Sequence, residues 1–449
     1  MSQKKYFGTD GIRGKVGGSV INPEFIKKLG YAIGIVLNAE TKTPRVLIGR
    51  DTRESGESLQ NALQDGLLSA GVDVVLLGII STPAVAFLTK KLSASAGIII
   101  SASHNPYDDN GIKIIGHDGF KLSDAAENEI EERVGVSVGV SVKREATALH
   151  NATSQYISHC IQLFQTLNLH NKKIILDCAN GATFNCAPEI FSAFNANIIS
   201  IHAKPNGKNI NEKCGATNVK SLQEKVLQEK ADCGIAFDGD GDRLMMVDHL
   251  GEIVDGDEIL CILATDETKK YSAVVGTLMS NLGLEKVVQS HNIKFERALV
   301  GDRYVLEKLL QHNWKLGGEN SGHIVNLDYA TTGDGIITAL QVLQIMQYTQ
   351  KPLHELKKIM QKRPQILLNV KVKNPAAFST MPEISRAVFD AEKKLNGSGR
   401  ILLRASGTES CVRVMVECDK EAQAHIVAES LVNIVQKCFA AEDTHQDTL

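Results

Sequence analysis

A short apolar run followed by a polar, glycine-containing loop recurs along this chain, and this repetition constrains the fold more than any other sequence feature. The runs are typical of buried strands, and the loops follow at their carboxyl ends. In wound α/β sheets, ligands bind at the carboxyl ends of the strands. We therefore expect equivalent parts of successive α/β domains, with functional residues in the loops. The pattern occurs at residues 96–106, 173–181, 232–243 and 315–323.

Helical segments alternate with predicted strands near the N-terminus. Asn22 and Pro23 indicate a helix start, because asparagine caps helices and proline fits the first turn. Apolar residues then recur on one helical face. A strand at 45–49, a helix at 54–70 and a strand at 72–77 follow. This alternation predicts an α/β layer structure.

The length of 449 residues predicts several domains rather than one. Candidate boundaries are a Gly/Ser/Val-rich stretch at 135–142, a segment near 250–257 and residues 362–364. After residue 366 the pattern changes to strand, helix, strand, strand, helix, which is typical of a small α+β domain. We expect domains at 1–150, 151–252, 253–364 and 365–449.

Composition narrows the class of protein. Hydrophobic residues make up 43% and charged residues 22% of the chain, as is ordinary for a protein that folds in water. The formal charge of −3 gives no field that would attract nucleic acid or anionic membranes, so an anionic ligand needs local cations. Nine cysteines without a CxxC pair favour a reducing cytosol. The chain shows no apolar signal core and no apolar run of about 18 residues, so we expect a cytoplasmic protein without membrane spans.

The loop from Asp238 to Arg243 contains the sharpest metal-binding pattern. Asp238, Asp240 and Asp242 alternate with glycines that permit a tight turn, so their carboxylates can converge on one hard cation. Ligation by oxygen alone favours Mg²⁺. An acidic turn facing solvent is the alternative, but its like charges would repel one another without a counter-ion. An EF-hand does not fit, since its sixth position would be Arg243 and its twelfth His249.

The same loop begins like the motif of aspartyl-phosphate phosphatases, in which the first aspartate of a DxDG sequence followed by Thr or Val is the nucleophile. Asp238 would then carry the phosphoryl group. The fifth residue, however, is Asp242 rather than Thr or Val. A phosphatase is therefore the second interpretation of this loop.

The loop at 101–106 presents hydroxyl groups after an apolar strand. Ser103 could act as a nucleophile or as the carrier of a transferred group. The G-x-S-x-G elbow of hydrolases is absent from the sequence. His104 is adjacent, but neighbours on an extended chain point to opposite sides, so we do not expect it to face Ser103. An ordinary Ser/Asn/Pro turn is the competing interpretation.

Two further loops offer groups for a phosphorylated sugar. Residues 404–410 join two predicted strands and, with Arg413, supply guanidinium groups, hydroxyls and a glycine, which suit a phosphate dianion. A hairpin loop with exposed arginines is the alternative. Glu319 and Ser321 offer hydrogen-bonding groups, and a carboxylate flanked by glycines suits hydroxyl or amine recognition on a sugar. His323 offers a titratable group, although a lone histidine is more often structural. Walker A and G-x-G-x-x-G patterns are missing, which argues against a nucleotide cofactor.

Five segments, in this order, resemble the motifs of the α-D-phosphohexomutases: residues 6–14, 101–106, 238–243, 318–323 and 404–409. The resemblance extends over nearly the whole chain. It implies three related mixed-sheet α/β domains plus a smaller C-terminal α+β domain around a central cleft. The N-terminal segment, the length and residues 300–305 are most similar to the bacterial members that isomerise glucosamine phosphate.

The resemblance implies an isomerase, an intramolecular phosphotransferase that interconverts glucosamine 6-phosphate and glucosamine 1-phosphate for UDP-N-acetylglucosamine and cell-wall precursors. Glucosamine 1,6-bisphosphate would be its intermediate and activator. Ser103 would be a phosphoserine, and its phosphate would bind Mg²⁺ together with Asp238, Asp240 and Asp242. A glucose or mannose phosphomutase is the alternative within the superfamily.

The resemblance also assigns roles to other residues. Arg13, Lys113 and His323 would lie near the phosphoserine as catalytic groups, either as acid or base or only as cations. A small-molecule phosphosugar is the expected partner, and the sequence is compatible with a homodimer. A non-enzymatic sugar-phosphate sensor, which would not need Ser103, is the remaining alternative. The sugar and its distal phosphate would contact Asp302, Arg303, Glu319, Ser321, Arg404, Ser406, Gly407, Thr408 and Arg413.

Overall fold

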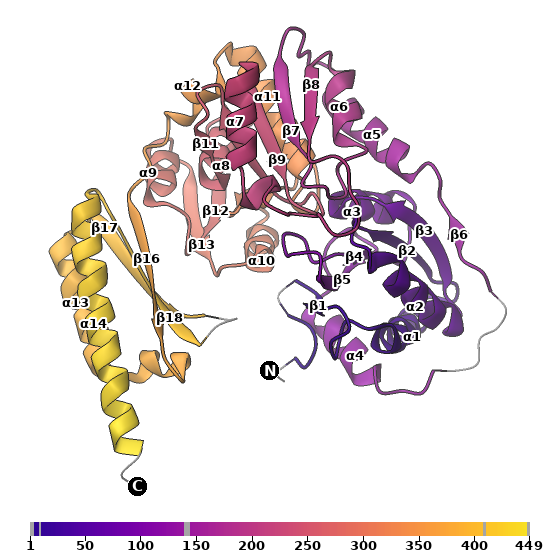
Figure 1. Ribbon diagram of the computed structural model, residues 1–449, viewed down its shortest axis with the longest axis horizontal. Coiled ribbons are helices and arrows are strands. Elements are labelled where there is room, and N and C mark those ends of the chain that lie inside the picture. The colour runs from indigo at the N-terminus through magenta and orange to yellow at the C-terminus, as the bar shows by residue number, and fades with distance from the viewer. Residues whose placement is uncertain (1–3, 9, 139–143, 407–409, 447–449) are drawn as a thin grey trace. The chain divides into compact units, whose positions relative to one another are not determined.

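A computed structural model describes residues 4–8, 10–138, 144–406 and 410–446 of the chain. The chain divides by contacts into two compact units. The N-terminal unit comprises residues 1–277 and 291–359, and the C-terminal unit comprises residues 278–290 and 360–449. Three sheets belong to the N-terminal unit and one to the C-terminal unit (Figure 1). The four domain ranges expected from the sequence stay predictions.

The first sheet has six strands in the order β1-β5-β4-β2-β3-β6. Strand β2 is parallel to β3 and β4, whereas β5 is antiparallel to β4. Helices α1, α2 and α4 contribute to the apolar cluster on one face, while α3 contacts β2 and β4. The elements are β1 (Ile12–Lys15), α1 (Pro23–Glu40), β2 (Arg45–Arg50), α2 (Gly56–Ser69), β3 (Asp73–Ile79), α3 (Thr82–Lys91), β4 (Ala96–Ile100), β5 (Asp109–Gly116), α4 (Asp124–Arg133) and β6 (Thr147–Ala148).

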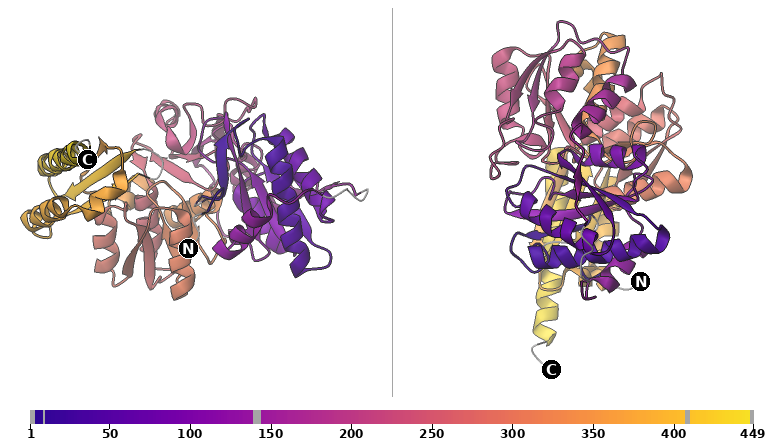
Figure 2. Two further views of the ribbon diagram at one scale, coloured as in Figure 1. Left: turned by 90° about the horizontal axis from the view of Figure 1, so that it is seen from below. Right: turned by 90° about the vertical axis from the view of Figure 1, so that its right-hand side faces the viewer.

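The predicted helix start at Asn22 is confirmed. The Asn22 side chain accepts a hydrogen bond from the Phe25 backbone N–H at 2.9 Å, and Pro23 occupies the first turn. Helix α1 lies side by side with α2 (Figure 2). The two helices approach closely because Gly66 of α2 faces α1 without a side chain: a Cβ atom there would lie 2.1 Å from the carbonyl oxygen of Lys27.

The second sheet has the order β11-β10-β9-β7-β8, and the third has the order β13-β12-β14-β15. The strands of the second sheet and the helices between them in the sequence are α5 (Ala152–Leu163), β7 (Lys173–Asp177), α6 (Ala187–Ala193), β8 (Asn197–Ile201), η1 (Gly215–Thr217), α7 (Lys220–Glu229), β9 (Cys233–Phe237), β10 (Leu244–Asp248) and β11 (Ile253–Val254). The strands of the third sheet and the helices near them in the sequence are α8 (Gly256–Ala264), β12 (Ala273–Thr277), β13 (Lys294–Ala298), α10 (Asp302–His312), β14 (Leu316–Gly318), β15 (Ile324–Asn326), α11 (Gly335–Thr349) and α12 (Leu353–Lys357).

These three sheets share one strand order. In each, a central strand pairs in parallel with two neighbours, and the second neighbour pairs with an antiparallel strand that directly follows it in the sequence. The loop between those last two strands carries Ser103 in the first sheet, Asp238 in the second and Glu319 in the third. The prediction of three related mixed-sheet α/β domains is therefore confirmed.

The C-terminal unit contains an antiparallel sheet in the order β16-β18-β17. Its helices pack on the sheet through an apolar core that includes Val412, Val414 and Leu431. The strand and helix sequence predicted after residue 366 is confirmed. No helix in the described part of the chain is both long and apolar enough to cross a bilayer. The elements are α9 (Leu282–Ser290), β16 (Gln365–Lys371), η2 (Pro375–Thr380), α13 (Pro382–Leu395), β17 (Gly399–Ala405), β18 (Cys411–Cys418) and α14 (Glu421–Gln446).

Candidate active site

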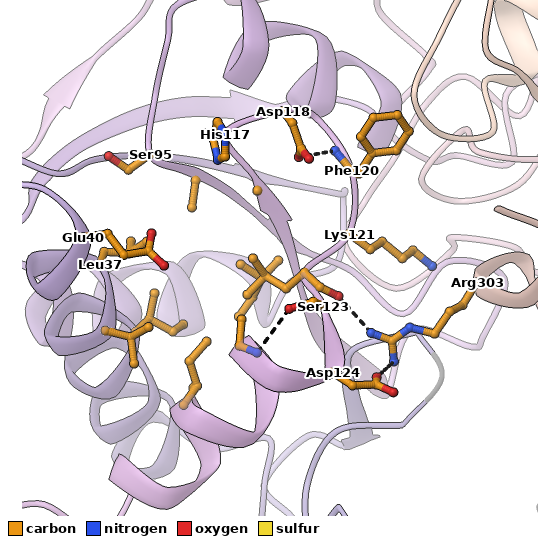
Figure 3. Close-up of a pocket in the computed structure, with 18 of the residues that line it drawn as sticks. Leu37, Glu40, Ser95, His117, Asp118, Phe120, Lys121, Ser123, Asp124 and Arg303 are labelled. Carbon is orange, nitrogen blue, oxygen red and sulfur yellow. Dashed lines mark hydrogen bonds and ion pairs between the residues drawn. The ribbon is translucent and has the colours of Figure 1, made fainter. Parts of the chain in front are cut away.

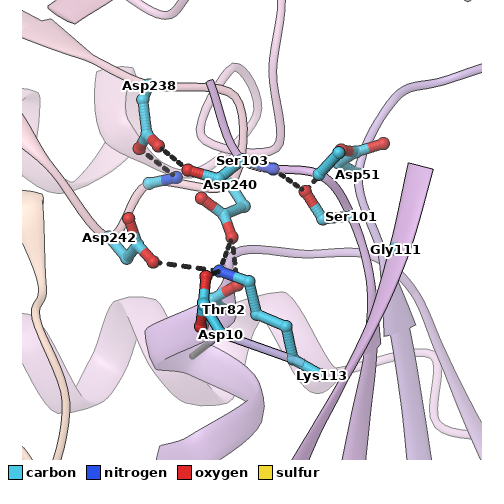
Figure 4. Close-up of polar contacts among 12 residues, drawn as sticks. Asp10, Asp51, Thr82, Ser101, Ser103, Gly111, Lys113, Asp238, Asp240 and Asp242 are labelled. Atoms are coloured by element: carbon cyan, nitrogen blue, oxygen red, sulfur yellow. Dashed lines mark hydrogen bonds and ion pairs between the residues drawn. The ribbon is translucent and has the colours of Figure 1, made fainter. Parts of the chain in front are cut away.

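Ser103 lies buried in the loop between β4 and β5, beside the aspartate loop that follows β9 (Figure 4). Its Oγ donates a hydrogen bond of 2.5 Å to Oδ2 of Asp238. Its backbone N–H donates to Oγ of Ser101 at 2.9 Å, and Ser101 in turn donates to Asp51 at 2.6 Å. The first and second sheets thus join at the serine that the sequence analysis selected.

The backbone of Ser103 is left-handed, with φ at +52°. This conformation is uncommon for a residue with a Cβ atom, and the sequence analysis assumed an extended chain here. The expectation that His104 points away is therefore wrong: its Nδ1 lies 3.3 Å from Oγ of Ser103. Burial, together with Arg243 and Arg13, lowers the pKa of His104 to about 4, so the ring is neutral near pH 7.

Arg53 fixes the backbone of the serine loop, and sequence reasoning did not identify it. The side chain is 1% exposed. Its guanidinium donates to the carbonyl oxygens of Ser103 at 3.1 Å, Asn105 at 2.9 Å and Asp109 at 3.0 Å, and also to that of Pro106. Its Nε pairs with Asp51 at 2.8 Å. The only sequence signal was its place just after strand β2, at another carboxyl strand end.

The carboxylates of Asp238, Asp240 and Asp242 converge as predicted: each offers an oxygen, and these oxygens lie within 4.8 Å of one another. All three residues are buried. The alternating glycines have distinct structural roles. A Cβ atom on Gly239 would lie 2.5 Å from the Ser103 carbonyl oxygen, and Gly241 has φ at +76°.

A hard cation fits this cluster. Oδ1 of Asp240 and Oδ1 of Asp242 are buried and have no hydrogen-bond partner among the residues that the structure describes. Buried carboxylate oxygens without partners are costly unless an ion or water satisfies them. Carboxylates are the ligands that Mg²⁺ prefers. Burial, reinforced by Asp242 and Asp240, raises the pKa of Asp238 well above its usual range in the absence of a cation.

Lys113, on β5, inserts its ammonium group among carboxylates (Figure 4). Nζ lies 2.8 Å from Oδ2 of Asp240, and 3.1 Å from both Oδ2 of Asp242 and Oδ2 of Asp10. Burial acts to lower the pKa of Lys113, but the three carboxylates together raise it well above its usual value. Thr82 donates a further hydrogen bond of 2.7 Å to Asp240. Lys113 thus holds a positive charge against the aspartate cluster.

A chain of charges links this centre to the third sheet. Asp10 pairs with Arg13 and Lys121, and Lys121 also pairs with Asp302 at the start of α10. His323 lies between two carboxylates: its Nδ1 is 3.6 Å from Asp242, and its Nε2 is 3.7 Å from Asp302. The structure therefore places Arg13, Asp302 and His323 in one network with the aspartates. Sequence reasoning did not predict Asp10 and Lys121 as parts of it.

Glu319 and Ser321 lie in the loop between β14 and β15. Glu319 is 7% exposed and accepts a hydrogen bond from the Gly301 backbone N–H at 3.1 Å. Burial raises its pKa, although His323 acts in the opposite direction. Oγ of Ser321 is buried without a hydrogen-bond partner within the described part of the chain. Both groups retain hydrogen-bonding capacity for a ligand.

The side chain of Arg303 extends toward Asp124 at the start of helix α4 (Figure 3). Its guanidinium donates to the Leu122 carbonyl at 2.9 Å and pairs with Asp124 at 2.8 Å and Glu127 at 3.1 Å. It lines a cavity of about 520 Å³ whose apolar wall includes residues of α1 and α10. Its contact with a sugar stays a prediction, and its ion pairs with Asp124 and Glu127 join α10 to α4.

The predicted phosphate-binding loop belongs to the C-terminal unit. Arg404 and Arg413 face each other in the register of β17 and β18. Burial, together with Arg413, lowers the pKa of Arg404, as expected where two cations lie close together. The Ser406 backbone N–H donates to the Cys411 carbonyl at 2.9 Å. Gly407 and Thr408 lie outside the described residues.

Four family models together match most of the chain. They are the Phosphoglucomutase/phosphomannomutase alpha/beta/alpha domains I, II and III, at residues 4–136, 154–251 and 255–363, and the C-terminal domain at residues 367–434. The chain belongs to the phosphoglucomutase/phosphomannomutase family. The resemblance of this family member to the α-D-phosphohexomutases, inferred from five motifs, is confirmed.

Curated relatives of this phosphoglucomutase/phosphomannomutase family member carry a more specific name. A phosphoglucosamine mutase of Coxiella burnetii (strain Dugway 5J108-111) is 53% identical over 443 residues, covering 97% of this chain and 99% of the relative. A phosphoglucosamine mutase of Legionella pneumophila (strain Corby) is 53% identical over 424 residues, covering 93% of each chain.

Solved structures share the fold of this family member. A phosphoglucomutase/phosphomannomutase family protein from Burkholderia thailandensis superposes with a TM-score of 0.80 at 22% identity, covering 96% of this chain and 97% of that one. An Aspergillus fumigatus N-acetylphosphoglucosamine mutase, solved with GlcNAc-6P and magnesium, gives a TM-score of 0.67 at 17% identity, covering 97% and 96% of the chains.

Proposed function

We propose that this enzyme interconverts glucosamine 6-phosphate and glucosamine 1-phosphate through a phosphorylated Ser103 and a 1,6-bisphosphate. The choice of sugar rests on the phosphoglucosamine mutases that are 53% identical to it over nearly the whole chain. The chemistry rests chiefly on one observation: a buried serine hydroxyl lies 2.5 Å from a carboxylate of a convergent aspartate cluster.

The proposed reaction has two balanced halves. In the first, the O1 hydroxyl of glucosamine 6-phosphate attacks the phosphorus of phospho-Ser103. The bond from phosphorus to Oγ breaks, O1 loses its proton, and Oγ regains one. The bisphosphate then turns around, and Oγ loses its proton as it attacks the phosphorus on O6. The bond from phosphorus to O6 breaks, O6 takes up a proton, glucosamine 1-phosphate leaves and phospho-Ser103 is restored. One serine therefore serves both ends of the sugar.

The surrounding groups have proposed roles that follow from their positions. Bound Mg²⁺, held by Asp238, Asp240 and Asp242, would neutralise charge on the transferring phosphoryl group. Lys113 adds a fixed cation beside Asp240 and Asp242. The Arg13 guanidinium donates a hydrogen bond of 3.4 Å to the Ala102 carbonyl oxygen in the serine loop. We assign these two residues a charge-stabilising role.

Proton transfer and sugar binding use the remaining predicted residues. We propose His323, held between Asp242 and Asp302, as an acid or base. We propose Glu319 and Ser321 as sugar ligands, because both retain hydrogen-bonding capacity. The distal phosphate would bind the paired arginines of β17 and β18 with the adjoining loop: Arg404, Ser406, Gly407, Thr408 and Arg413.

The decisive experiment is Ser103→Ala in the full chain, assayed in both directions. We expect kcat to fall at least about 1000-fold, because the proposed reaction has Ser103 as its only carrier of the phosphoryl group. Ser221→Ala is the matched control, since the buried Oγ of Ser221 has no hydrogen-bond partner in the described structure. Full activity of Ser103→Ala, with native circular dichroism, would refute the proposal.

Two measurements separate the competing functions. Intact-mass and peptide analysis of the wild-type enzyme should place one phosphoryl group on Ser103, and hydroxylamine should leave it in place. Release by hydroxylamine would instead indicate an acyl phosphate on Asp238, as in a phosphatase. Comparison of kcat/KM for glucosamine, glucose and mannose phosphates should favour the amino sugar. If none of the three sugar phosphates is turned over, the non-enzymatic sugar-phosphate sensor would be the remaining interpretation.

A further inference from the structure

Behind the serine loop, three potential metal ligands of different chemistry meet. Asp177 ends strand β7, His202 follows strand β8, and Cys214 precedes the short helix η1. Each offers one ligand atom, and these atoms lie within 4.8 Å of one another. The proposed mutase reaction uses none of the three residues.

The contacts of His202 point to a shared ligand. Its Nδ1 lies 3.1 Å from Oδ2 of Asp177. This nitrogen is nevertheless buried and has no partner of hydrogen-bond geometry among the described residues. Two ligand atoms at this separation fit the edge of a tetrahedron around a small cation. The backbone of His202 is left-handed, with φ at +46°, and this conformation is uncommon for histidine.

Asp177 and Cys214 complete the cluster. Both are 0% exposed. Each carboxylate oxygen of Asp177 accepts one backbone N–H at 2.9 Å, from Ala179 and Gly215, which fixes its orientation and leaves further lone pairs. Burial, together with Asp177 and Glu212, raises the pKa of the Cys214 thiol to about 12.

A second mixed cluster shows why this one is distinctive. Asp248, Glu252 and His354 also lie within 4.8 Å of one another. There, however, Nζ of Lys357 lies 2.9 Å from Asp248 and 2.6 Å from Glu252, so a protein cation already occupies the position. Asp177 has no lysine or arginine at ion-pair distance in the described part of the chain.

We propose that Asp177, His202 and Cys214 bind a zinc ion. Thiolate, imidazole and carboxylate are the ligand types of zinc sites, and a thiolate selects Zn²⁺ over Mg²⁺. Binding releases the thiol proton to solvent and leaves a fourth position of the tetrahedron open to water. The site is separate from the aspartate cluster, which offers oxygen alone.

The ion would brace loops that support the reaction centre. Three residues before Cys214, the side chain of Asn211 donates to the carbonyl oxygens of Ser103 at 2.8 Å and Asn105 at 3.0 Å. Beyond Asp177, the Asn180 carbonyl accepts a hydrogen bond of 2.5 Å from Thr52. Zinc binding should therefore raise the midpoint of thermal unfolding.

Cobalt(II) added to the reduced full-length enzyme in excess Mg²⁺ is the direct test. We expect one Co²⁺ to bind with the near-ultraviolet absorption of a thiolate ligand, which Co²⁺ at the aspartate cluster cannot produce. Cys214→Ala should abolish this absorption. His202→Asn should weaken Co²⁺ binding at least 10-fold, and asparagine tolerates the left-handed backbone. Cys261→Ala, a buried cysteine of α8, is the matched control and should keep the absorption.

A readout on the wild-type protein keeps the test decisive if a variant fails to fold. X-ray absorption of the zinc-loaded enzyme should show one sulfur ligand at about 2.3 Å with nitrogen or oxygen ligands. Absence of a sulfur ligand in the folded wild-type protein would overturn the proposal. So would thiolate absorption that persists in Cys214→Ala. Neither result would bear on the mutase assay of Ser103→Ala.

Discussion

The left-handed backbone of Ser103 costs about 1 kcal/mol or more for a residue with a side chain. The neighbouring contacts offset that cost. Arg53 and Asn211 both donate to the Ser103 carbonyl, and Ser101 accepts its N–H. This backbone directs Oγ toward both Asp238 and His104. The Ser103 hydroxyl, which we propose as the phosphoryl carrier, is therefore positioned by residues that do not touch it.

Replacing Arg53 tests that positioning. Lysine keeps the charge but cannot reach several carbonyl oxygens at once. For Arg53→Lys we expect kcat/KM to fall about 10- to 100-fold, because small displacements of a reacting group are costly. Arg45→Lys, at the exposed start of β2, is the control and should be neutral. Equal activity of the two variants would show that Arg53 does not position Ser103.

Asp334 should make stability depend on pH. It caps helix α11 through the Ile337 N–H and accepts a hydrogen bond from Tyr156, and burial raises its pKa to about 6. The fold thus favours the neutral carboxyl. The neutral carboxyl contributes up to about 2 to 3 kcal/mol to the free energy of unfolding. This contribution is fully present below the unfolded pKa of about 3.9 and is lost as pH rises through 6.

Asp334→Asn removes this titration and keeps the cap. The midpoint of thermal unfolding of the variant, relative to wild type, should be several degrees higher at pH 7.5 than at pH 5. The exposed Asp328→Asn variant should show no such trend. Parallel pH profiles for Asp334→Asn and wild type would contradict the assignment of a raised pKa.

The sequence motifs predicted which residues come together better than they predicted the individual contacts. Ser103, Lys113 and the aspartate cluster come together as expected, because loops at carboxyl strand ends converge in this fold. The orientation of His104 was mispredicted, since nothing in the sequence indicates a left-handed serine. Arg53 was missed because its partners are backbone oxygens about 50 residues away, which leave no local pattern.

At the scale of helices and strands, periodicity and capping predicted most elements near the N-terminus. The antiparallel strands β5, β10 and β15 were not assigned a direction, because an apolar run alone does not reveal how it pairs. Each of these strands follows directly after the loop that carries Ser103, Asp238 or Glu319, so both ends of that loop are held in the sheet.

The crossing of α1 and α2 gives a prediction about packing. In Gly66→Ala, the added methyl group would lie 2.1 Å from the Lys27 carbonyl oxygen, so the helices must separate. We expect a loss of about 1 to 3 kcal/mol, seen as a lower midpoint of thermal unfolding. Gly135→Ala is the control, because a Cβ atom there meets nothing within 4 Å. Equal midpoints would mean that the helices adjust without cost.

At the scale of the whole molecule, the C-terminal unit includes a segment from the middle of the chain. Arg400 holds it: the guanidinium donates to the Leu278 carbonyl and the Ser280 carbonyl at 2.7 Å each, and Nε pairs with Glu417 at 2.6 Å. Glu417 is fully buried and also accepts the Leu282 N–H at 2.6 Å. Sequence reasoning expected this segment within 253–364 and had no signal for its contacts.

Arg400→Met should loosen the C-terminal unit selectively. The buried Glu417 carboxylate would lose its charged partner, which costs about 3 to 5 kcal/mol. Hydrogen exchange should therefore accelerate in β17 and β18, with little change in the three N-terminal sheets. Lys286→Met is the control, since the exposed pair of Lys286 with Asp419, at 3.7 Å, should contribute under about 1 kcal/mol. Equal acceleration of hydrogen exchange in both units would contradict the prediction that the effect is confined to the C-terminal unit.

The shared strand order has a consequence for biosynthesis. Because each of the three sheets contributes a different loop, a nascent chain holds the whole candidate site only after all three loops have been synthesised. A nascent chain that has just exposed Ser103 lacks the aspartates, and one that has reached Asp242 still lacks His323. Under the proposed function, a partly synthesised chain that lacks one of these loops should therefore not turn over sugar phosphates.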